Sequence, residues 1–412
     1  MTDPTRFTLR LALFYGAQFL LLGAYLPYFP VWLDGRGLGP EEVAVVLAAT
    51  AFARMLFTPL VGFAADRAGD RRRVLKALGW ASLGTCLALA FCESFAAILP
   101  VTIAFVLSWT SAMPITETVA MSGVRTAGLD YGRMRLWGSL AFVAASVAGG
   151  FVVGARGGEA ALWLIGVGAA AMAAGTYWLP PPTGRGMLRA AAAIPRVRLR
   201  DALGLARSPL FLLFLATAGA TQAAHAVYYA FGTLHWREQG IAGGTIGMLW
   251  TVGVVAEILL FTVSRRAVAA LGAVPLIALA GAAAVLRWTI TAFDPPLWLL
   301  FSVQALHGLT FGAAHLGAIH FIAQAVPEEY AATAQGLYAS VAGGLMMGLA
   351  MAAAGPLYAG LGAFAYLPMA GVALAALLGA LLLMRQWRAG SEAARTSHPH
   401  RPGSGGQTRA PS

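Results

Sequence analysis

Ionisable side chains stand inside long apolar runs of this sequence, where a charge is costly. Glu117 lies within the apolar residues 114–121, and Arg135 follows eighteen residues later, where the next apolar run begins. If both runs cross a bilayer, the carboxylate lies in hydrocarbon, and burial there favours its protonated form. A side chain of this kind can bind and release a proton, so the pattern indicates proton binding within a membrane.

Three more ionisable side chains lie within apolar runs. Glu257 is a second acid, and Arg54 and Arg287 each require a carboxylate, a carbonyl group or water as a partner. Arg54 either pairs with Glu257 or faces a cavity that admits an anionic substrate. For Arg287, extension of the side chain to the membrane surface explains the sequence as well as a functional role does.

Aromatic residues accompany these charges. Tyr25, Tyr228, Tyr229 and Trp250 fall in runs that we expect to face or flank a central cavity. Aromatic walls with a few convergent polar groups suit an aromatic or amphipathic small molecule as the substrate. The alternative is the aromatic belt at the membrane surface, which accounts for Tyr25 about equally well.

The composition indicates a membrane protein. Of the 412 residues, 59% are hydrophobic and only 11% are charged, whereas soluble domains carry roughly 25% charged residues. The net charge of +11 comes from arginines clustered between apolar runs, as the positive-inside rule requires, so we expect no nucleic-acid partner. Cys86 and Cys92 match no metal or redox motif, and His225 has no second ligand four residues on. We therefore expect no metal and no cofactor.

Windows of about 20 apolar residues, the length that crosses a bilayer, occur twelve times in the chain. The predicted fold is an all-α membrane protein with twelve transmembrane helices, built as two pseudo-symmetric six-helix bundles. The predicted spans are residues 11–31, 43–63, 74–92, 97–121, 136–154, 160–179, 209–231, 244–263, 274–292, 297–322, 333–354 and 363–384.

The distribution of arginine predicts the topology. Every second loop is rich in arginine, which places both chain ends in the cytoplasm and the protein in the plasma (inner) membrane, where we expect a monomer. The expected divisions are an N-terminal bundle over residues 1–180, a basic cytoplasmic linker over 181–208, a C-terminal bundle over 209–387 and a disordered tail over 388–412.

The two halves of the chain resemble each other. Gly37 and Arg54 correspond to Gly240 and Glu257 at a constant offset of 203 residues. Internal duplication is typical of secondary transporters, whose site lies near the midplane between the repeats. The first spans of the two halves are also parallel, since Gln18, Tyr25 and Trp32 correspond to Gln222, Tyr228 and Trp236. This parallel adds Gln222 to the candidate site.

The loop after the second span carries a motif. Residues 62–72 read Gly-Phe-Ala-Ala-Asp-Arg-Ala-Gly-Asp-Arg-Arg, which resembles the Gly-x-x-x-Asp-Arg-x-Gly loop of the major facilitator superfamily, with Asp70 where a basic residue is usual. A glycine at position 62 allows a neighbouring helix to approach closely, and Asp66 can face a helix N-terminus. The alternative is an ordinary basic loop. The resemblance implies a cytoplasmic gate of Gly62, Asp66, Arg67, Gly69, Arg71 and Arg72.

A second, narrower resemblance covers most of the chain. Residues 130–139 resemble the equivalent segment of the 3-phenylpropionic acid permease group and, more loosely, that of the related lactose permeases. Residues 224–229, 249–257 and 285–288 also agree with the first group. This resemblance implies a proton symporter.

The lactose permease resemblance implies roles for individual side chains. In those proteins, acids on spans 4 and 8 share an arginine on span 5, and Glu117, Glu257 and Arg135 stand at these places. The arginine can hold both acids ionised through bidentate hydrogen bonds. The alternative is that Arg135 caps the loop while both acids lock helices together.

His307 lies twenty residues after Arg287, as does a histidine of the lactose permeases that takes part in substrate binding and coupling. The carboxylate expected three residues later is replaced by Thr310. Glu117 or Glu257 must therefore carry the proton if transport is proton-coupled.

The expected function is secondary active transport by alternating access, in which a small organic acid such as 3-phenylpropionate is imported with protons across the lipid bilayer. A sugar or a nucleoside is the alternative substrate. Drug efflux is less favoured, because residues 148–151 lack the Gly-Pro motif of drug antiporters. A non-transporting membrane sensor is a further alternative from a different class of protein. An enzyme is not expected, since the sequence has no nucleophile–base spacing.

Overall fold

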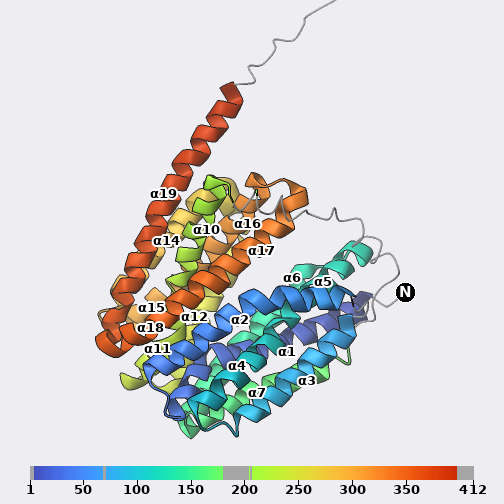
Figure 1. Ribbon diagram of the computed structural model, residues 1–412, viewed down its shortest axis with the longest axis vertical. Coiled ribbons are helices and arrows are strands. Elements are labelled where there is room, and N and C mark those ends of the chain that lie inside the picture. The colour runs from blue at the N-terminus through green and yellow to red at the C-terminus, as the bar shows by residue number, and fades with distance from the viewer. Residues whose placement is uncertain (1–3, 68–70, 180–203, 205–206, 397–412) are drawn as a thin grey trace, which may run out of the picture.

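The computed structural model describes residues 4–67, 71–179, 204 and 207–396, and every regular element within them is helical (Figure 1). One group of helices comprises α1 (Pro4–Gly35), α2 (Pro40–Arg67), α3 (Arg71–Leu89), α4 (Phe95–Thr110), α5 (Ala112–Ala127), α6 (Tyr131–Arg156) and α7 (Glu159–Gly175). The second group comprises α10 (Pro209–Ala223), α11 (Ala226–Glu238), α12 (Gly243–Thr262), α13 (Ser264–Leu271), α14 (Ala273–Thr291), α15 (Leu297–Ala305), η1 (Gly308–Ala313), α16 (Ala314–Ala325), η2 (Glu328–Tyr330), α17 (Ala331–Tyr338), η3 (Ala339–Met346), α18 (Met347–Leu361), η4 (Gly362–Ala365) and α19 (Tyr366–Thr396).

Each of the predicted membrane spans overlaps one or more of these helices. In the part of the chain that is described, nine helical segments are long and apolar enough to cross a membrane. One of them, Thr333–Arg388, contains two predicted spans that meet at the short 3₁₀ turn η4. Helices α3 and α7, which are less apolar or shorter, provide the remaining two, so the twelve-helix fold agrees with the prediction.

Several spans are interrupted near their middle. The fourth span breaks at Ser111 between α4 and α5, and the seventh breaks at Ala224 and His225 between α10 and α11. The tenth and eleventh spans contain the π-helical turns η1 and η3. A π-turn widens the helix and is frequent at functional sites. The breaks in the tenth and eleventh spans lie beside the cavity described below.

Glycines allow the two groups of helices to approach closely along α6–α12 and α2–α18. A Cβ atom built at Gly150 would collide with the backbone of Gly243, and one built at Gly355 would lie 2.8 Å from Cα of Glu41. These contacts lie toward one end of the helices. In Figure 1 the two groups converge near α11 and diverge toward α5 and α16.

The internal repeat is visible in the backbone. Gly37 follows the end of α1 with φ 81°, and Gly240 follows the end of α11 with φ 77°. Both occupy the left-handed region that glycine favours at helix ends. The second span of each half follows at once, with Arg54 on α2 and Glu257 on α12.

Two features differ from the predictions. Residues 388–396, expected to be disordered, continue α19 as far as Thr396, since this segment is rich in alanine, the best helix former. The amphipathic helix α13 lies in a loop where no helix was expected. Most of the predicted linker and the rest of the tail lie outside the described residues, so the division of the chain into domains stays a prediction.

Candidate functional site

A cavity of about 560 Å³ lies between the two groups of helices. Its walls come from α1, α2, α4 and α6 on one side and from α10–α12, η1, η3 and α18 on the other. The structure places seven of the predicted site residues on these walls, namely Tyr25, Arg54, Arg135, Gln222, Tyr229, Glu257 and His307.

Arg54 lies at the middle of α2, and its side chain is exposed to this cavity. The structure gives it no hydrogen bond and no ion pair with any described residue. Its charge interacts with Tyr25, which also lies close to Thr50, one helical turn before Arg54. The alternative in which Arg54 pairs with Glu257 is not seen in this conformation.

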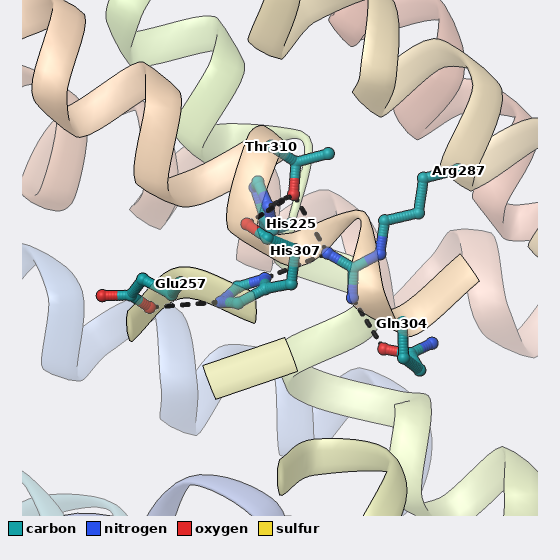
Figure 2. A network of polar contacts seen from close by, with 6 residues as sticks. All are labelled: His225, Glu257, Arg287, Gln304, His307 and Thr310. Atoms are coloured by element: carbon teal, nitrogen blue, oxygen red, sulfur yellow. Dashed lines mark hydrogen bonds and ion pairs between the residues drawn. The ribbon is translucent and has the colours of Figure 1, made fainter. Parts of the chain in front are cut away.

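A polar network runs from the cavity wall into the second group of helices (Figure 2). The Glu257 carboxylate lies 3.9 Å from Nε2 of His307, and Nη1 of Arg287 donates to Nδ1 of that histidine at 3.0 Å. Arg287 also donates from Nη1 to Oγ1 of Thr310 at 3.1 Å and from Nη2 to Oε1 of Gln304 at 2.7 Å.

Arg287 is fully buried. Its guanidinium lies 4.7 Å from the ring centre of Tyr228 and 4.4 Å from that of Trp288. Cation–π contacts and neutral acceptors thus surround this charge, and none of the carboxylates in the described ranges forms an ion pair with it. The alternative that Arg287 extends to the membrane surface is wrong, because these acceptors hold the guanidinium inside the bundle.

The tautomer of His307 follows from its partners. Arginine is only a donor, so Nδ1 of His307 must accept from Arg287. The neutral ring therefore carries its proton on Nε2, which faces Glu257. Protonation of Nδ1 would break the bond to Arg287 and set two cations against each other. Glu257 is thus the group of this pair that can take a proton at low cost.

His225 repairs the break between α10 and α11. Its backbone N–H bonds to Gln222, and Nδ1 of its ring lies 3.1 Å from the free carbonyl oxygen of Thr221, to which it must donate. Nε2 then accepts from the hydroxyl of Thr310 at 3.0 Å. His225 is a buried structural member of the network rather than a cavity wall residue.

Arg135 lies over the ring of Phe19, 3.9 Å from its centre, and reaches electrostatically toward Glu257 across the cavity. Glu117 is half-buried beside Tyr15 and Tyr131, and Tyr131 contacts Arg135 as well. The predicted triad is therefore gathered in one region. However, Glu117 is not among the described residues that line the cavity, and no ion pair joins Arg135 to either of these described acids.

The predicted aromatic wall divides into two layers. Tyr25 and Tyr229 line the cavity, whereas Tyr228 and Trp250 lie buried behind it. Tyr228 stacks on Trp250 with ring centres 4.5 Å apart, and the indole N–H of Trp250 donates to Thr233. These two residues support the wall and do not form it.

The predicted gate lies at the end of the helices away from the glycine contacts. A Cβ atom at Gly62 would meet nothing within 4 Å, so the expected close helix approach is absent in this conformation, because the two groups diverge here. Arg67 lies over the Phe63 ring, and Arg72 donates to the carbonyl oxygen of Tyr177. Arg71 begins α3, while Gly69 and the side chain of Asp66 lie outside the described residues.

Sequence reasoning missed several site residues. Gln304 and Phe311 precede and follow His307 by three and four residues, so helical spacing alone could have placed them on its face. Trp109 lines the opposite wall, and nothing in its local sequence separates it from an ordinary interfacial tryptophan.

Twelve helical spans in two groups, with charged side chains around a central cavity, define a secondary transporter of the major facilitator type. The chain belongs to the MFS_1 like family, because the model of that family matches residues 8–367. The predicted superfamily and fold are confirmed.

Named relatives agree with this family. The chain is 34% identical over 378 residues to a probable 3-phenylpropionic acid transporter of Escherichia coli strain K12, covering 89% of this chain and 95% of that protein. It is 29% identical over 338 residues to a maltose permease of Geobacillus stearothermophilus, covering 81% and 83% of the two chains. These relatives are transporters and not enzymes.

A solved structure of the nucleoside transporter NupG resembles this fold with a TM-score of 0.78 at 18% identity, covering 92% of this chain and 99% of that chain.

Proposed function

We propose that this chain imports a small organic acid together with a proton, with 3-phenylpropionate and related aromatic acids as the leading substrates. The observation that carries the proposal is that Arg54 and Glu257 stand on the walls of one cavity, at corresponding positions of the two repeats. Arg54 has no hydrogen-bond or ion-pair partner among the described residues, and the Glu257 carboxylate lies 3.9 Å from Nε2 of the neutral His307 ring. The cavity thus offers one place for an anion and one for a proton.

Charge balance links the two ligands. Arg54, Arg135 and Arg287 outnumber the ionised acids Glu117 and Glu257 by one, so a monoanion neutralises the site. A proton on Glu257 adds a positive charge to the cavity and strengthens its attraction for the anion. By linkage, the anion strengthens proton binding to the same degree. Loaded together, the anion and the proton cancel each other's charge, so the loaded site carries the same net charge as the empty one.

The similarity to the 3-phenylpropionic acid transporter supports an aromatic acid. The cavity also suits an apolar ring, since Tyr229, Trp109 and Phe311 line it. An aromatic substrate of this kind needs one polar anchor and a large apolar wall.

Alternating access would then proceed by rocking of the two bundles. With both chain ends in the cytoplasm, as the arginine distribution predicts, the glycine contacts close the outer end of the cavity and the described state opens inward. We propose that the protein works in this way as a monomer in the inner membrane, with residues 62–72 forming the inner gate.

Uptake of labelled 3-phenylpropionate into proteoliposomes, with and without an inward proton gradient, tests this function. Accumulation that depends on the gradient is the expected result. Failure of uptake in vesicles that contain folded protein would reject the aromatic acid as the substrate.

A nucleoside or a sugar is the second candidate substrate. The maltose permease relative and the likeness to a nucleoside transporter favour it, together with neutral polar groups on the cavity wall such as Gln222, Thr50 and Ser139. Competition of labelled 3-phenylpropionate uptake by unlabelled maltose or uridine separates the candidates.

A further inference from the structure

Three arginines lie close enough to the cavity to meet an anion, and their surroundings differ. Arg287 uses Nη1 for His307 and Thr310 and Nη2 for Gln304. Aromatic rings cover its faces, and the whole side chain is buried behind the wall. A substrate could reach this guanidinium only by displacing the groups that keep it in the bundle.

Arg135 lines the cavity but already has partners. Its guanidinium stacks on Phe19, with Tyr15 also beneath it at 5.9 Å. Its charge acts on Glu257 from one side, and it shares Tyr131 with Glu117 on the other. A cation held between two acids offers a substrate anion little net attraction, because each acid repels the incoming carboxylate.

Arg54 differs from both. It lies at mid-span on α2, is exposed to the cavity, and makes neither a hydrogen bond nor an ion pair with any residue in the described ranges. A guanidinium at the middle of a membrane span requires an anionic or carbonyl partner, or water. The partner that the protein does not supply can come from the substrate.

We propose that the guanidinium of Arg54 binds the carboxylate of the substrate. As a single anion site, it makes the protein select substrates with one carboxylate group. This inference rests on the proposed function and names its specificity-determining residue. The planar guanidinium can bind one carboxylate through two parallel N–H···O bonds. The hydroxyl of Tyr25, beside Arg54, can add a further donor by turning away from Thr50.

The groups around Arg54 orient the rest of the ligand. The Thr50 hydroxyl already donates to the carbonyl oxygen of Leu47 at 2.7 Å, so it does not compete for the carboxylate as a donor. The Tyr25 ring meets Trp109 edge-on with ring centres 5.5 Å apart. The carboxylate therefore lies on the α1–α2 side, and the apolar body extends past Trp109 toward Tyr229 and Phe311 on the opposite wall.

A dicarboxylate would need a second open cation. Within the described part of the cavity wall, the other arginine is Arg135, whose charge is shared with Glu117 and Glu257. One available arginine binds one carboxylate group. Dicarboxylates such as succinate are therefore excluded as substrates.

Binding measurements test this assignment separately from transport. Purified protein in lipid nanodiscs is titrated by calorimetry with 3-phenylpropionate and with its neutral amide. Arg54→Gln is expected to lower affinity for the acid about 10- to 100-fold, as loss of a charge-assisted hydrogen-bonded pair does, and to leave affinity for the amide unchanged. Arg133→Gln is the matched control, since Arg133 lies exposed at the surface, where it pairs with Asp130.

Arg54→His provides a second test that does not depend on tolerance of glutamine. The Arg54→His protein is expected to bind the acid more tightly than the amide at about pH 5.5. This preference should fall at about pH 7.5, because an imidazole loses its charge near its ordinary pKa of about 6.5. The wild-type protein, measured at both pH values, corrects for any change elsewhere.

The outcomes separate the two proposals. A folded Arg54→Gln protein that prefers the acid as strongly as wild type would overturn the role of Arg54 and leave the proposed function standing. Wild-type protein that binds 3-phenylpropionate no better than its amide would overturn both. Equal binding of succinate and 3-phenylpropionate would reject the monocarboxylate class.

Discussion

Hydrogen-bond direction determines which side chain near the cavity can titrate. Arg287 can only donate, so its bond to Nδ1 of His307 leaves that ring neutral with its other N–H toward Glu257. Glu257 keeps 22% of its side chain accessible and has no arginine in contact. A proton can therefore reach Glu257 from the cavity without disturbing the network behind it.

Glu257→Gln is expected to abolish accumulation of substrate driven by a proton gradient while leaving counterflow exchange active. The amide keeps the shape of the side chain and permanently mimics the protonated state. Uptake into proteoliposomes and counterflow in the same vesicles measure the two activities.

Two comparisons belong with this experiment. Glu93→Gln, in the exposed loop between α3 and α4, should behave as wild type. Glu117→Gln tests the other candidate acid. Intact gradient-driven accumulation in Glu257→Gln, together with its loss in Glu117→Gln, would transfer the proton-carrying role to Glu117.

Thr310→Val is expected to destabilise the protein by about 1–3 kcal/mol, because it removes the hydroxyl between Arg287 and His225 and leaves buried polar atoms without partners. Thermal unfolding of the purified protein measures the loss. Thr310→Ser restores the hydroxyl and should recover most of the stability. Equal stability of the valine and serine variants would show that the hydroxyl bridge is not required.

The presence of charged side chains inside the helix bundles was predictable, but their pairing was not. Arg54, Glu257 and Arg287 stand out because ionisable groups in apolar runs are rare. Which of them has a partner depends on atoms from separate helices, such as Gln304 beside Arg287. A single sequence does not reveal those contacts.

At the scale of elements, the π-helical turn η1 positions the network. His307 directly precedes it, and Thr310 lies within it. A Cβ atom at Gly308 would lie 2.8 Å from the backbone carbonyl of Ala256, the residue before Glu257. Glycine at this position therefore keeps η1 and α12 close enough for His307 to face Glu257.

Gly308→Ala is expected to cost about 1–3 kcal/mol through overpacking and to weaken proton-driven uptake, because α12 and η1 must separate. Thermal unfolding and proteoliposome uptake measure the two effects. Gly371→Ala in α19, where a Cβ atom meets nothing within 4 Å, is the matched control. An unchanged Gly308→Ala protein would mean that the backbone shifts without cost.

The positions of the spans followed from the apolar windows, but the full lengths of the helices and their interruptions did not. No proline or glycine marks the break at Ala224 and His225, which is instead made possible by a side-chain bond from His225 to Thr221. The π-turn η3 contains the pair Gly343 and Gly344, but this pair does not predict a π-turn, since Gly149 and Gly150 lie within the uninterrupted helix α6. Tertiary contacts between spans decide such local geometry.

At the scale of the whole molecule, the two bundles touch through backbone rather than side chains at one end. Gly150 and Gly154 on α6 face Gly243 on α12, and Gly247 faces the carbonyl group of Ser146. A contact without side chains leaves no room for an added methyl group. Replacing one of these glycines by alanine must therefore push the two bundles apart at this end.

Gly150→Ala is expected to shift the conformational equilibrium about 10- to 100-fold toward the state that is open at this end, and to slow uptake. Distances between spin labels on the two bundles, measured in nanodiscs, report the populations. Gly84→Ala on α3, where a Cβ atom meets open space, is the control. An unaltered distance distribution in Gly150→Ala would contradict the proposed role of this contact.

The buried Arg287 also limits which ions the transporter can use. Its guanidinium stays charged at any physiological pH, and Arg54 and Arg135 add two further positive charges at the cavity wall. Sodium ions and hydrophobic quaternary ammonium compounds therefore meet electrostatic repulsion however well they fit by size. A proton avoids this barrier because it arrives as part of a neutral acid or is taken up directly by a carboxylate. On the proposed function, the same arginines that would attract an organic anion would disfavour cationic drugs in the cavity.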